Sequence, residues 1–352
     1  MRGQRIAAFI RWIALSCVFA VVASASLGTV SGHAGTALRA GRIAFLRSPP
    51  VAVPRDKVLF VMNADGTGLR RLSSADSFVQ RHAWSPDGSS IAYTDGDSLW
   101  LVRPDGTRPI RLFSRPGMTS VTLTWSPDGK AIAAELYENG KGTETYVVPT
   151  DGSTPHRLGT ATWQDPSWSP RGDRIAYGSN CAIWTVRSDG SDVRPVARPP
   201  RKRSGGCWGG PSWTPNGRRL GFAGGNSIDG RYALLYVVNP DRSGLRELTR
   251  HAYNEYGFRW SPDGRTILYG KENRKGIYVI GVDGRHDRKV TTDSPAQIGW
   301  GALTWSSDGR SIAYATNRTG NGDIYVVGVN GRNKIRLTTS SDMDIDPSWA
   351  PR

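Results

Sequence analysis

One short motif recurs along this chain at nearly constant spacing, and it constrains the fold more than any other feature. The motif is Trp-Ser-Pro-Asp-Gly or a close variant, with a shortened last copy. Its copies begin at Trp84, Trp125, Trp168, Trp213, Trp260, Trp305 and Trp349. Successive tryptophans are 41 to 47 residues apart, and a repeat of this length is typical of β-propellers and solenoids.

Each copy predicts a tight turn between two strands. Proline presets φ for the turn, Asp or Asn bonds its own backbone, and Gly takes the left-handed position. A short apolar strand follows, as in "IAY" from Ile91, and then a third strand such as "IYVV". A second turn, for example Asp283-Gly284, leads into a fourth strand such as "KIRLT". Four antiparallel strands per repeat make one propeller blade.

The two ends of the repeat region predict how the ring closes. The segment from Gly41 to Phe45 is typical of a second strand without its first, and the segment from Trp349 to Arg352 is typical of a first strand without its second. We expect the C-terminal strand to complete the N-terminal blade, which leaves no open sheet edge. The predicted fold for residues 41–352 is therefore all-β, a seven-bladed β-propeller of four-stranded antiparallel blades.

The series W-S-P-D-G, I-A-Y, I-Y-V-V and R-L-T, which extends from Gly41 to Arg352, resembles the TolB-type, WD-repeat-like β-propeller family. The resemblance implies a fold and says little about function. Similar blades occur in periplasmic TolB, in the propellers of prolyl oligopeptidases and dipeptidyl peptidases, and in pectate-degrading lyases. This chain has seven repeats where TolB has six, and no extra N-terminal domain. It also lacks the G-x-S-x-G elbow of the α/β-hydrolase peptidases.

Residues 1–25 are typical of a signal peptide, with three arginines before an apolar stretch and a small-residue cleavage site at Ala23 to Ala25. A second cleavage site ends at Ala34, and residues 26–40 are interpreted as a short linker. An uncleaved membrane anchor stays an alternative, because Trp12 to Val30 carries no charge. We expect the protein in the periplasm, at the cell surface or in the medium, with only transient membrane contact through this segment.

The formal net charge of +16 falls to +13 without the three arginines of the signal segment, and 38 of the 46 basic residues are arginine. Many follow a turn glycine, as Arg265 and Arg310 do, which predicts spread charge and no single patch. For an exported monomer this favours a protein partner or an anionic envelope glycan over nucleic acid. A general preference for arginine codons explains the same composition.

Strand order places the variable loops on the face opposite the repeated turn, and binding residues are expected on such loops. Cys181 opens a third strand and Cys207 lies in the connector leaving that blade, so we predict a disulfide between them, with two free thiols as the alternative. Arg201, Lys202 and Arg203 in the same connector suggest a docking point for carboxylate or phosphate, or else a solvated loop.

A group of aromatic and polar residues is predicted near the mouth of the channel. Trp163, Trp208 and Trp300 each stand five residues before a repeat tryptophan, and Tyr256 lies in a nearby connector. Together with the polar residues Gln164, Asp165 and Gln297, these rings form a candidate platform on which a sugar or apolar ring stacks. The alternative is that the rings fill the space between blades.

Motifs for catalysis are scarce in this sequence. There is no H-E-x-x-H, C-x-x-C or P-loop. His82 on an inner strand and His251 in a connector are expected near the channel, but no third histidine is placed to complete a metal site, so we predict no metal and no cofactor. The sequence thus favours a non-catalytic, exported scaffold that binds a protein or glycan. A carbohydrate-active lyase acting on acidic polysaccharide is the alternative, and enzymatic activity stays open.

Overall fold

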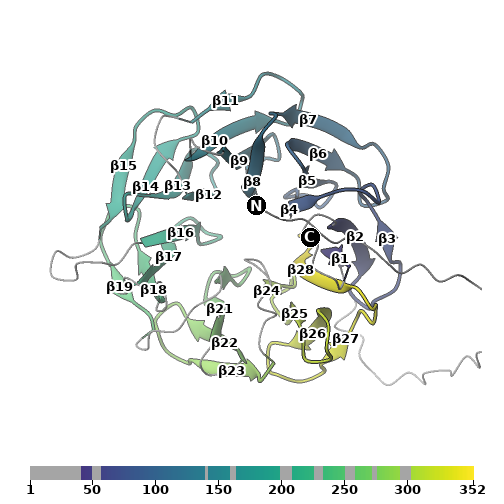
Figure 1. Cartoon of the computed structure of the whole chain (residues 1–352). Helices are drawn as coiled ribbons and strands as arrows, with labels where there is room; N and C mark the ends of the chain where they lie inside the picture. Colours follow the sequence, from purple (N-terminus) through teal and green to yellow (C-terminus); the bar gives the residue numbers. More distant parts are fainter. Residues whose placement is uncertain are drawn as a thin grey trace, which may run out of the picture. The chain divides into compact units, whose positions relative to one another are not determined.

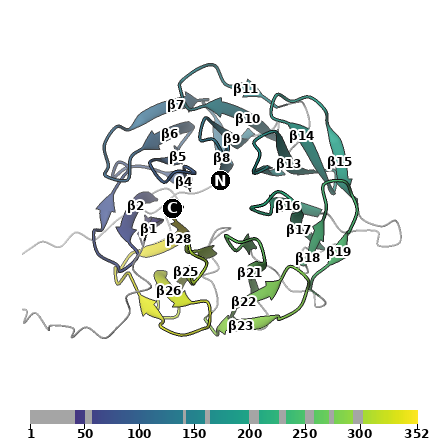
Figure 2. The same cartoon turned by 180° about the vertical axis from the view of Figure 1, so that it is seen from behind.

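The computed structural model describes nine segments of the chain, all within the compact unit Gly35–Arg352. They are residues 41–49, 57–138, 142–158, 164–198, 208–225, 233–249, 258–271, 276–293 and 303–352. These segments form 28 strands in seven four-stranded antiparallel sheets. The sheets stand around a ring, seen from its two sides in Figures 1 and 2. The predicted all-β, seven-bladed propeller is confirmed.

The strands follow the repeat in chain order. The blade that joins both ends contains β28 (Met343–Trp349), β1 (Arg42–Ser48), β2 (Val58–Asn63) and β3 (Arg70–Arg71). The next three contain β4 (Val79–Trp84), β5 (Ile91–Asp95), β6 (Ser98–Val102) and β7 (Ile110–Ser114); β8 (Met118–Trp125), β9 (Ala131–Glu138), β10 (Gly142–Pro149) and β11 (His156–Arg157); and β12 (Gln164–Trp168), β13 (Arg174–Ser179), β14 (Ala182–Arg187) and β15 (Arg194–Ala197).

The remaining three blades repeat the same order. They contain β16 (Trp208–Trp213), β17 (Leu220–Gly225), β18 (Ala233–Val238) and β19 (Arg246–Glu247); β20 (Arg259–Trp260), β21 (Thr266–Lys271), β22 (Gly276–Gly281) and β23 (Arg288–Thr291); and β24 (Leu303–Trp305), β25 (Ser311–Thr316), β26 (Asp323–Gly328) and β27 (Ile335–Arg336). Within the described ranges, no helix has the length and hydropathy needed to span a bilayer. Residues 1–40 lie outside those ranges, so the signal peptide and linker stay predictions.

The C-terminal strand closes the ring as expected. β28 pairs antiparallel with β1, with Ile43 opposite Trp349 and Ser48 opposite Met343. The amide of Ala350 donates to the carbonyl of Arg42 at 2.8 Å. Main-chain hydrogen bonds therefore hold the ring shut at this blade.

The repeated turn is built by its own side chains. In the copy at Trp260, the hydroxyl of Ser261 donates to Asp263 Oδ1 at 2.6 Å, and the amide of Arg265 donates to the same oxygen at 3.0 Å. These hydrogen bonds hold the pKa of Asp263 below its usual value. Gly264 has φ of 66°, the left-handed conformation that favours glycine. The Asp and Gly of the motif therefore serve turn geometry.

The tryptophan of the motif joins neighbouring blades. The indole Nε1 of Trp125 donates to the carbonyl of Ala83, and that of Trp260 to the carbonyl of Ser212, at 3.0 and 3.1 Å. In both cases the acceptor lies on the inner strand of the preceding blade. Among the described residues, buried apolar side chains form seven clusters, one at each interface between neighbouring blades. The hydrophobic core therefore lies between the blades.

The outermost strands carry part of the excess of arginine. Three arginines and one histidine at their starts contact a backbone carbonyl of the next blade, at 2.6 to 3.3 Å. The pairs are Arg70 with Asp105, His156 with Ser188, Arg246 with Val282, and Arg288 with Val329. Some of the basic charge thus holds adjacent blades together.

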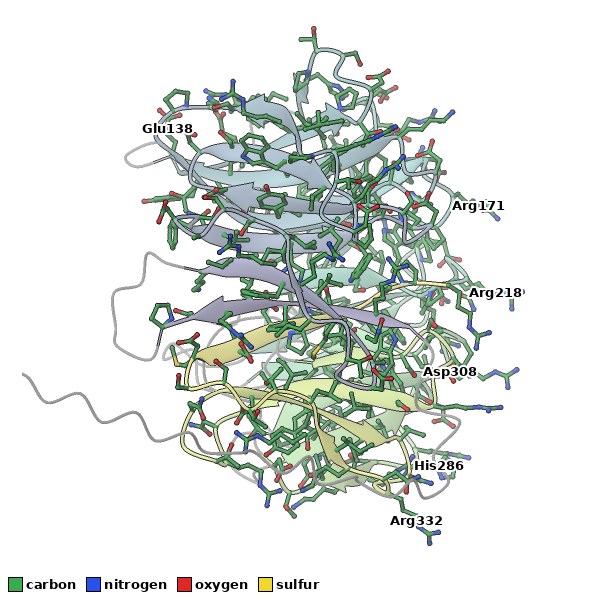
Figure 3. All side chains as sticks on the ribbon, turned by 90° about the vertical axis from the view of Figure 1, so that its right-hand side faces the viewer. Glu138, Arg171, Arg218, His286, Asp308 and Arg332 are labelled. Carbon is green, nitrogen blue, oxygen red and sulfur yellow. The ribbon has the colours of Figure 1, made fainter. Side chains whose placement is uncertain are left out.

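The two faces of the ring differ as strand order requires. Arg171, Arg218 and Asp308 belong to copies of the repeated turn and lie on one side in Figure 3. Glu138 ends the second strand of its blade and lies on the other side (Figure 3). The inner strands run between these faces.

Candidate functional site at the ring centre

Seven inner strands, β4, β8, β12, β16, β20, β24 and β28, lie nearest the axis of the ring (Figure 1). In a propeller such strands surround a central channel. Several charged and polar side chains of these strands, with one from β9, act on one another electrostatically or through hydrogen bonds. We call this set the ring-centre cluster: Arg81, His82, Glu135, Asp165, Arg259, Asp346 and Ser348.

The side chain of Arg259 on β20 lies in an enclosed but water-accessible environment. Its side chain is exposed, yet removal from bulk solvent lowers the pKa of its guanidinium group. The carboxylates of Asp346 and Asp165, from β28 and β12, oppose that shift. Exposure to water together with desolvation is expected of a side chain inside a channel. Arg259 therefore interacts electrostatically with two carboxylates contributed by different blades.

Asp165 and Asp346 occupy the same unusual backbone position. Both begin the sequence Asp-Pro-Ser-Trp, and both have positive φ, 51° and 54°. Each lies where the pairing of its inner strand shifts register. Such bulges re-aim side chains and are common beside active sites, and left-handed non-glycine residues are conformationally costly. The bulge thus redirects two carboxylates at corresponding places in two blades.

Glu135 on β9 adds a buried carboxyl group beside Asp165. Its Oε2 accepts the amide of Asp165 at 3.0 Å, and the residue is 1% exposed. Burial raises the pKa of Glu135 to about 7, with a smaller contribution from the Asp165 carboxylate. At neutral pH this group is therefore close to half protonated. It can give or take a proton at the ring centre.

Ser348, His82 and Asp346 form a chain of three polar side chains. His82 Nε2 lies 2.8 Å from Ser348 Oγ. His82 Nδ1 lies 4.0 Å from Asp346 Oδ2. The histidine side chain is 1% exposed, and burial lowers its pKa, which leaves the imidazole neutral at pH 7. A neutral imidazole beside a hydroxyl is able to accept its proton.

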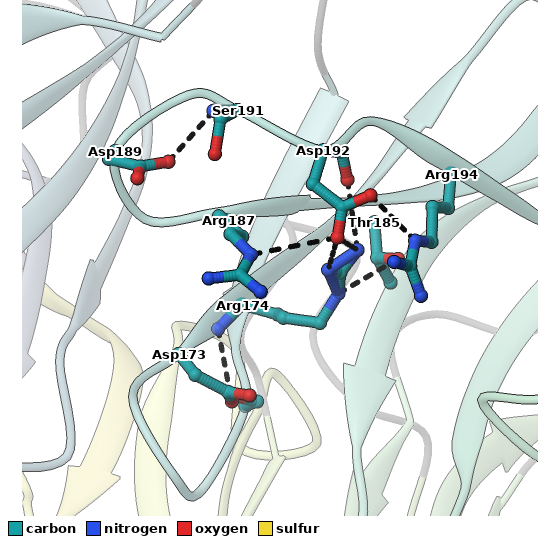
Figure 4. Close-up of polar contacts among 9 residues, drawn as sticks. Asp173, Arg174, Thr185, Arg187, Asp189, Ser191, Asp192 and Arg194 are labelled. Atoms are coloured by element: carbon teal, nitrogen blue, oxygen red, sulfur yellow. Dashed lines mark hydrogen bonds and ion pairs between the residues drawn. The ribbon is translucent and has the colours of Figure 1, made fainter.

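In a second ionic cluster, shown in Figure 4, one carboxylate is shared by three arginines. Arg194, Arg174 and Arg187 approach the carboxylate of Asp192 at 2.6, 3.0 and 3.6 Å. The hydrogen bond from Arg194 contributes most to lowering the pKa of Asp192. The cluster ties the turn between β14 and β15 to the neighbouring strands. We assign it a structural role.

Asp165 is the one sequence-predicted site residue that the structure places at the ring centre. Gln164 begins β12 beside it. The remaining predicted positions, Trp163, Arg201, Lys202, Arg203, Tyr256, Gln297 and Trp300, lie outside the described residues. Their proposed roles therefore stay predictions.

Trp208 lies in the hydrophobic cluster between its own blade and the preceding one. It is 5% exposed, and its ring is 5.0 Å from Phe222 and 5.1 Å from Tyr236. A Cβ at Gly224 would lie 2.2 Å from Trp208 Cδ1, so glycine makes room for the indole. Trp208 thus follows the alternative in which the ring fills hydrophobic space.

Cys181 is disulfide-bonded. Cys207 lies outside the described residues, so its pairing with Cys181 stays a prediction. The backbone amide of Trp208, the residue after Cys207, donates to the carbonyl of Cys181 at 3.4 Å. Within the described ranges, no three His, Cys, Asp or Glu side chains gather closely enough to hold a metal ion.

Sequence reasoning passed over Glu135, Asp346 and Ser348, and comparison of the repeats marks only the first of them. Asp346 and Ser348 match Asp165 and Ser167 at the corresponding positions. When the repeats are aligned on the motif tryptophan, the position of His82 is otherwise Leu, Phe or Pro. The position of Glu135 is likewise Thr, Gly, Ala or Leu in the other blades. Departures from an apolar or small consensus identify side chains that the blade itself does not require.

No family model matches this sequence. Over 279 residues the chain is 27% identical to "Tricorn protease homolog 1" of Streptomyces coelicolor, covering 74% of this chain and 26% of the relative. Over 220 residues it is 22% identical to "Uncharacterized peptidase YuxL" of Bacillus subtilis, covering 57% of this chain and 31% of the relative. The chain therefore spans between a quarter and a third of the length of these two relatives.

Solved structures share the fold at low identity. A puromycin hydrolase mutant complexed with PGG has a TM-score of 0.66 at 17% identity, over 85% of this chain and 52% of that one. An oligogalacturonate lyase with manganese also reaches 0.66, at 14% identity, over 77% and 82% of the two chains. TolB from Acinetobacter baumannii reaches 0.56 at 16% identity, over 88% and 82%. The chain is thus a TolB-like β-propeller in fold.

These findings correct the functional prediction. The expectation of a non-catalytic scaffold is wrong, because the relatives by sequence are a protease homologue and a peptidase. The alternative of a polysaccharide lyase gains no support, since the likeness to oligogalacturonate lyase at 14% identity concerns the fold alone. The predicted export, location, monomeric state and partners stay predictions.

Proposed function

We propose that this chain acts in peptide hydrolysis and that its ring centre binds the peptide substrate. The observation that carries the proposal is the set of opposite charges on the inner strands. Arg259 acts electrostatically on both Asp165 and Asp346, although the three residues come from three different blades. The named activities of the relatives, a protease and a peptidase, support the same substrate class.

The charges at the ring centre suit the groups that a peptide presents. A guanidinium group binds a carboxylate through two parallel hydrogen bonds, and a carboxylate accepts hydrogen bonds from an ammonium group. An enclosed site strengthens both interactions relative to open water. Arg259 is therefore assigned to the peptide's C-terminal carboxylate, and Asp165 to its amino group. Short peptides with free ends are the expected substrates.

Binding of a dye-labelled tetrapeptide with a free carboxyl end tests this function. We expect its amidated form to bind about tenfold more weakly, and Arg259→Gln to reduce binding of the free acid by a similar factor, because each change removes one charge-assisted contact. Arg242→Gln, in an exposed turn, is the matched control and should leave binding unchanged. Equal affinity for both peptides, or no binding to the wild-type chain, would rule the proposal out.

A further inference from the structure

We infer that Ser348, His82 and Asp346 form an acyl-transfer site in which Ser348 is the nucleophile. Such a site goes beyond peptide binding, because bond cleavage then takes place on the propeller's own strands. Its substrates are carboxylic esters or amides whose carbonyl group reaches the inner strands β4 and β28.

Ring closure brings the three side chains together. His82 on β4 and Ser348 on β28 are 266 positions apart in sequence, yet Nε2 and Oγ are separated by 2.8 Å. Asp346 Oδ2 faces the other ring nitrogen at 4.0 Å. A hydroxyl, an imidazole and a carboxylate in this order are the groups of a serine nucleophile, its base and the group that orients the base.

The other blades show that the propeller does not need this contact. At the position of Ser348, the hydroxyl of Ser167 accepts the amide of Trp213 at 3.4 Å, and that of Thr304 accepts the amide of Trp349 at 3.3 Å. Each of those hydroxyls bonds the backbone of the next blade. Ser348 instead meets an imidazole, in a position where other repeats have Leu, Phe or Pro.

The surroundings of His82 favour its action as a base. Burial is the main cause that lowers the pKa of His82, and Arg81 on the same strand lowers it further. Asp346 on β28 and a hydrogen bond involving the backbone of Ala44 on β1 act in the opposite direction. The proposed site requires the tautomer with its proton on Nδ1, the ring nitrogen that lies 4.0 Å from the Asp346 carboxylate. Nε2 is then free to accept the hydroxyl proton of Ser348.

The reaction balances with water as the only co-reactant. Ser348 Oγ forms a bond to the acyl carbon while its proton passes to His82 Nε2. The bond to the leaving alcohol or amine breaks, and the same proton passes to that leaving group. Water, deprotonated by His82, then attacks the acyl-serine and releases the acid, which restores the Ser348 hydroxyl. The positive charge of Arg81, which acts electrostatically on His82, favours the negative charge that develops on the carbonyl oxygen.

A fluorophosphonate probe, which phosphonylates activated serines, tests the site on the full chain. We expect stoichiometric labelling at Ser348, located by peptide mass spectrometry, and hydrolysis of p-nitrophenyl acetate. His82→Leu should reduce the labelling rate by about 100-fold, because it removes the general base. Leu occupies the corresponding position in two other repeats, at Leu123 and Leu303, so this variant is expected to fold. Ser167→Ala and Thr304→Ala are matched controls that should label at the wild-type rate.

Asp346 is a positioning residue, and its variant has a separate readout. Asp346→Asn should slow labelling and move the acid limb of its pH profile to lower pH, because the carboxylate raises the pKa of His82. A folded wild-type chain that is not labelled, or His82→Leu labelled at the wild-type rate, would overturn the inference. If the chain binds peptide but is not labelled, the acyl-transfer inference is wrong while the proposed function is still supported. The two hypotheses are therefore tested independently.

Discussion

The guanidinium group of Arg47 binds the carboxylate of Asp344 through two hydrogen bonds, at 2.6 and 2.9 Å, and so joins β1 to β28. The side chain of Asp344 is fully buried and that of Arg47 is 18% exposed. The guanidinium group also lies over the ring of Phe60, 4.9 Å from its centre. The contact strengthens the one place where the ring is closed by strands from opposite ends of the repeat region.

Removal of this arginine should weaken the closed ring. Arg47→Met leaves the Asp344 carboxylate buried without a counter-charge, which costs about 3 to 5 kcal/mol for a buried pair. Chemical denaturation of both proteins measures the loss. Arg42→Met, at an exposed position of the same strand, should change stability by less than about 0.5 kcal/mol. Equal stability of Arg47→Met and wild type would show that the ion pair does not support closure.

Stability should depend on pH through Glu135. Its folded pKa of about 7 exceeds its ordinary value of 4.5, so the folded state holds the proton more tightly than the unfolded chain. The stabilisation is complete below pH 4.5 and is lost as the pH rises through 7. Relative to Glu135→Gln, the wild type should lose roughly 2 to 3 kcal/mol between pH 4.5 and pH 8. Denaturant unfolding of both proteins across this range gives the difference; parallel pH curves would contradict the assignment.

A single methyl group should disturb the packing of Trp208. Gly224→Ala places a Cβ 2.2 Å from the indole, which Phe222 and Tyr236 hold from other sides. Overpacking of this kind costs about 1 to 3 kcal/mol. Gly209→Ala is the matched control in the same sheet, because its added Cβ meets no atom within 4 Å. Thermal unfolding should rank Gly224→Ala below both the control and the wild type.

The charge cluster around Asp192 should become repulsive when its carboxylate is removed. Asp192→Asn leaves Arg174, Arg187 and Arg194 close together without their common partner. We expect a lower unfolding temperature, with a deficit that shrinks as salt screens the repulsion. Asp189→Asn, in the same turn, is the control, because the Asp189 carboxylate accepts the amide of Ser191 and makes no ion pair with the three arginines in the described structure. A deficit that does not change with salt would point to lost hydrogen bonding and not to charge.

The sequence was sufficient to predict the fold because the repeats share the same turn-forming and blade-packing residues. Ser261, Asp263 and Gly264 build their turn without help from distant residues, and the motif tryptophans provide the contacts between blades. The direction of a side chain near the end of a strand is harder to predict, because successive residues point to opposite faces. For this reason Trp208 was predicted to be part of the ligand-binding platform, although its side chain packs in the hydrophobic core.

The ring-centre cluster could be predicted only in part. Asp165 was selected for its place beside a predicted aromatic platform, whereas its contacts are with Glu135 and Thr122 on other strands. The contact between His82 and Ser348 depends on ring closure and on the bulge at Asp346. The spacing of residues in the sequence does not show how close these two features bring the side chains. The local sign of this site was departure from the repeat consensus, and it applies to His82 and Glu135 but not to Ser348 or Asp346.

Strand β28 belongs to the blade of β1 but follows the other 27 described strands in sequence. During synthesis on the ribosome, β1, β2 and β3 are made first and must wait without their inner partner while six further blades emerge. Domains fold as units, and unpaired strand edges are prone to aggregation in the meantime. The first blade therefore cannot be completed until residues 343–349 have been synthesised. The contact between His82 and Ser348 depends on the same step.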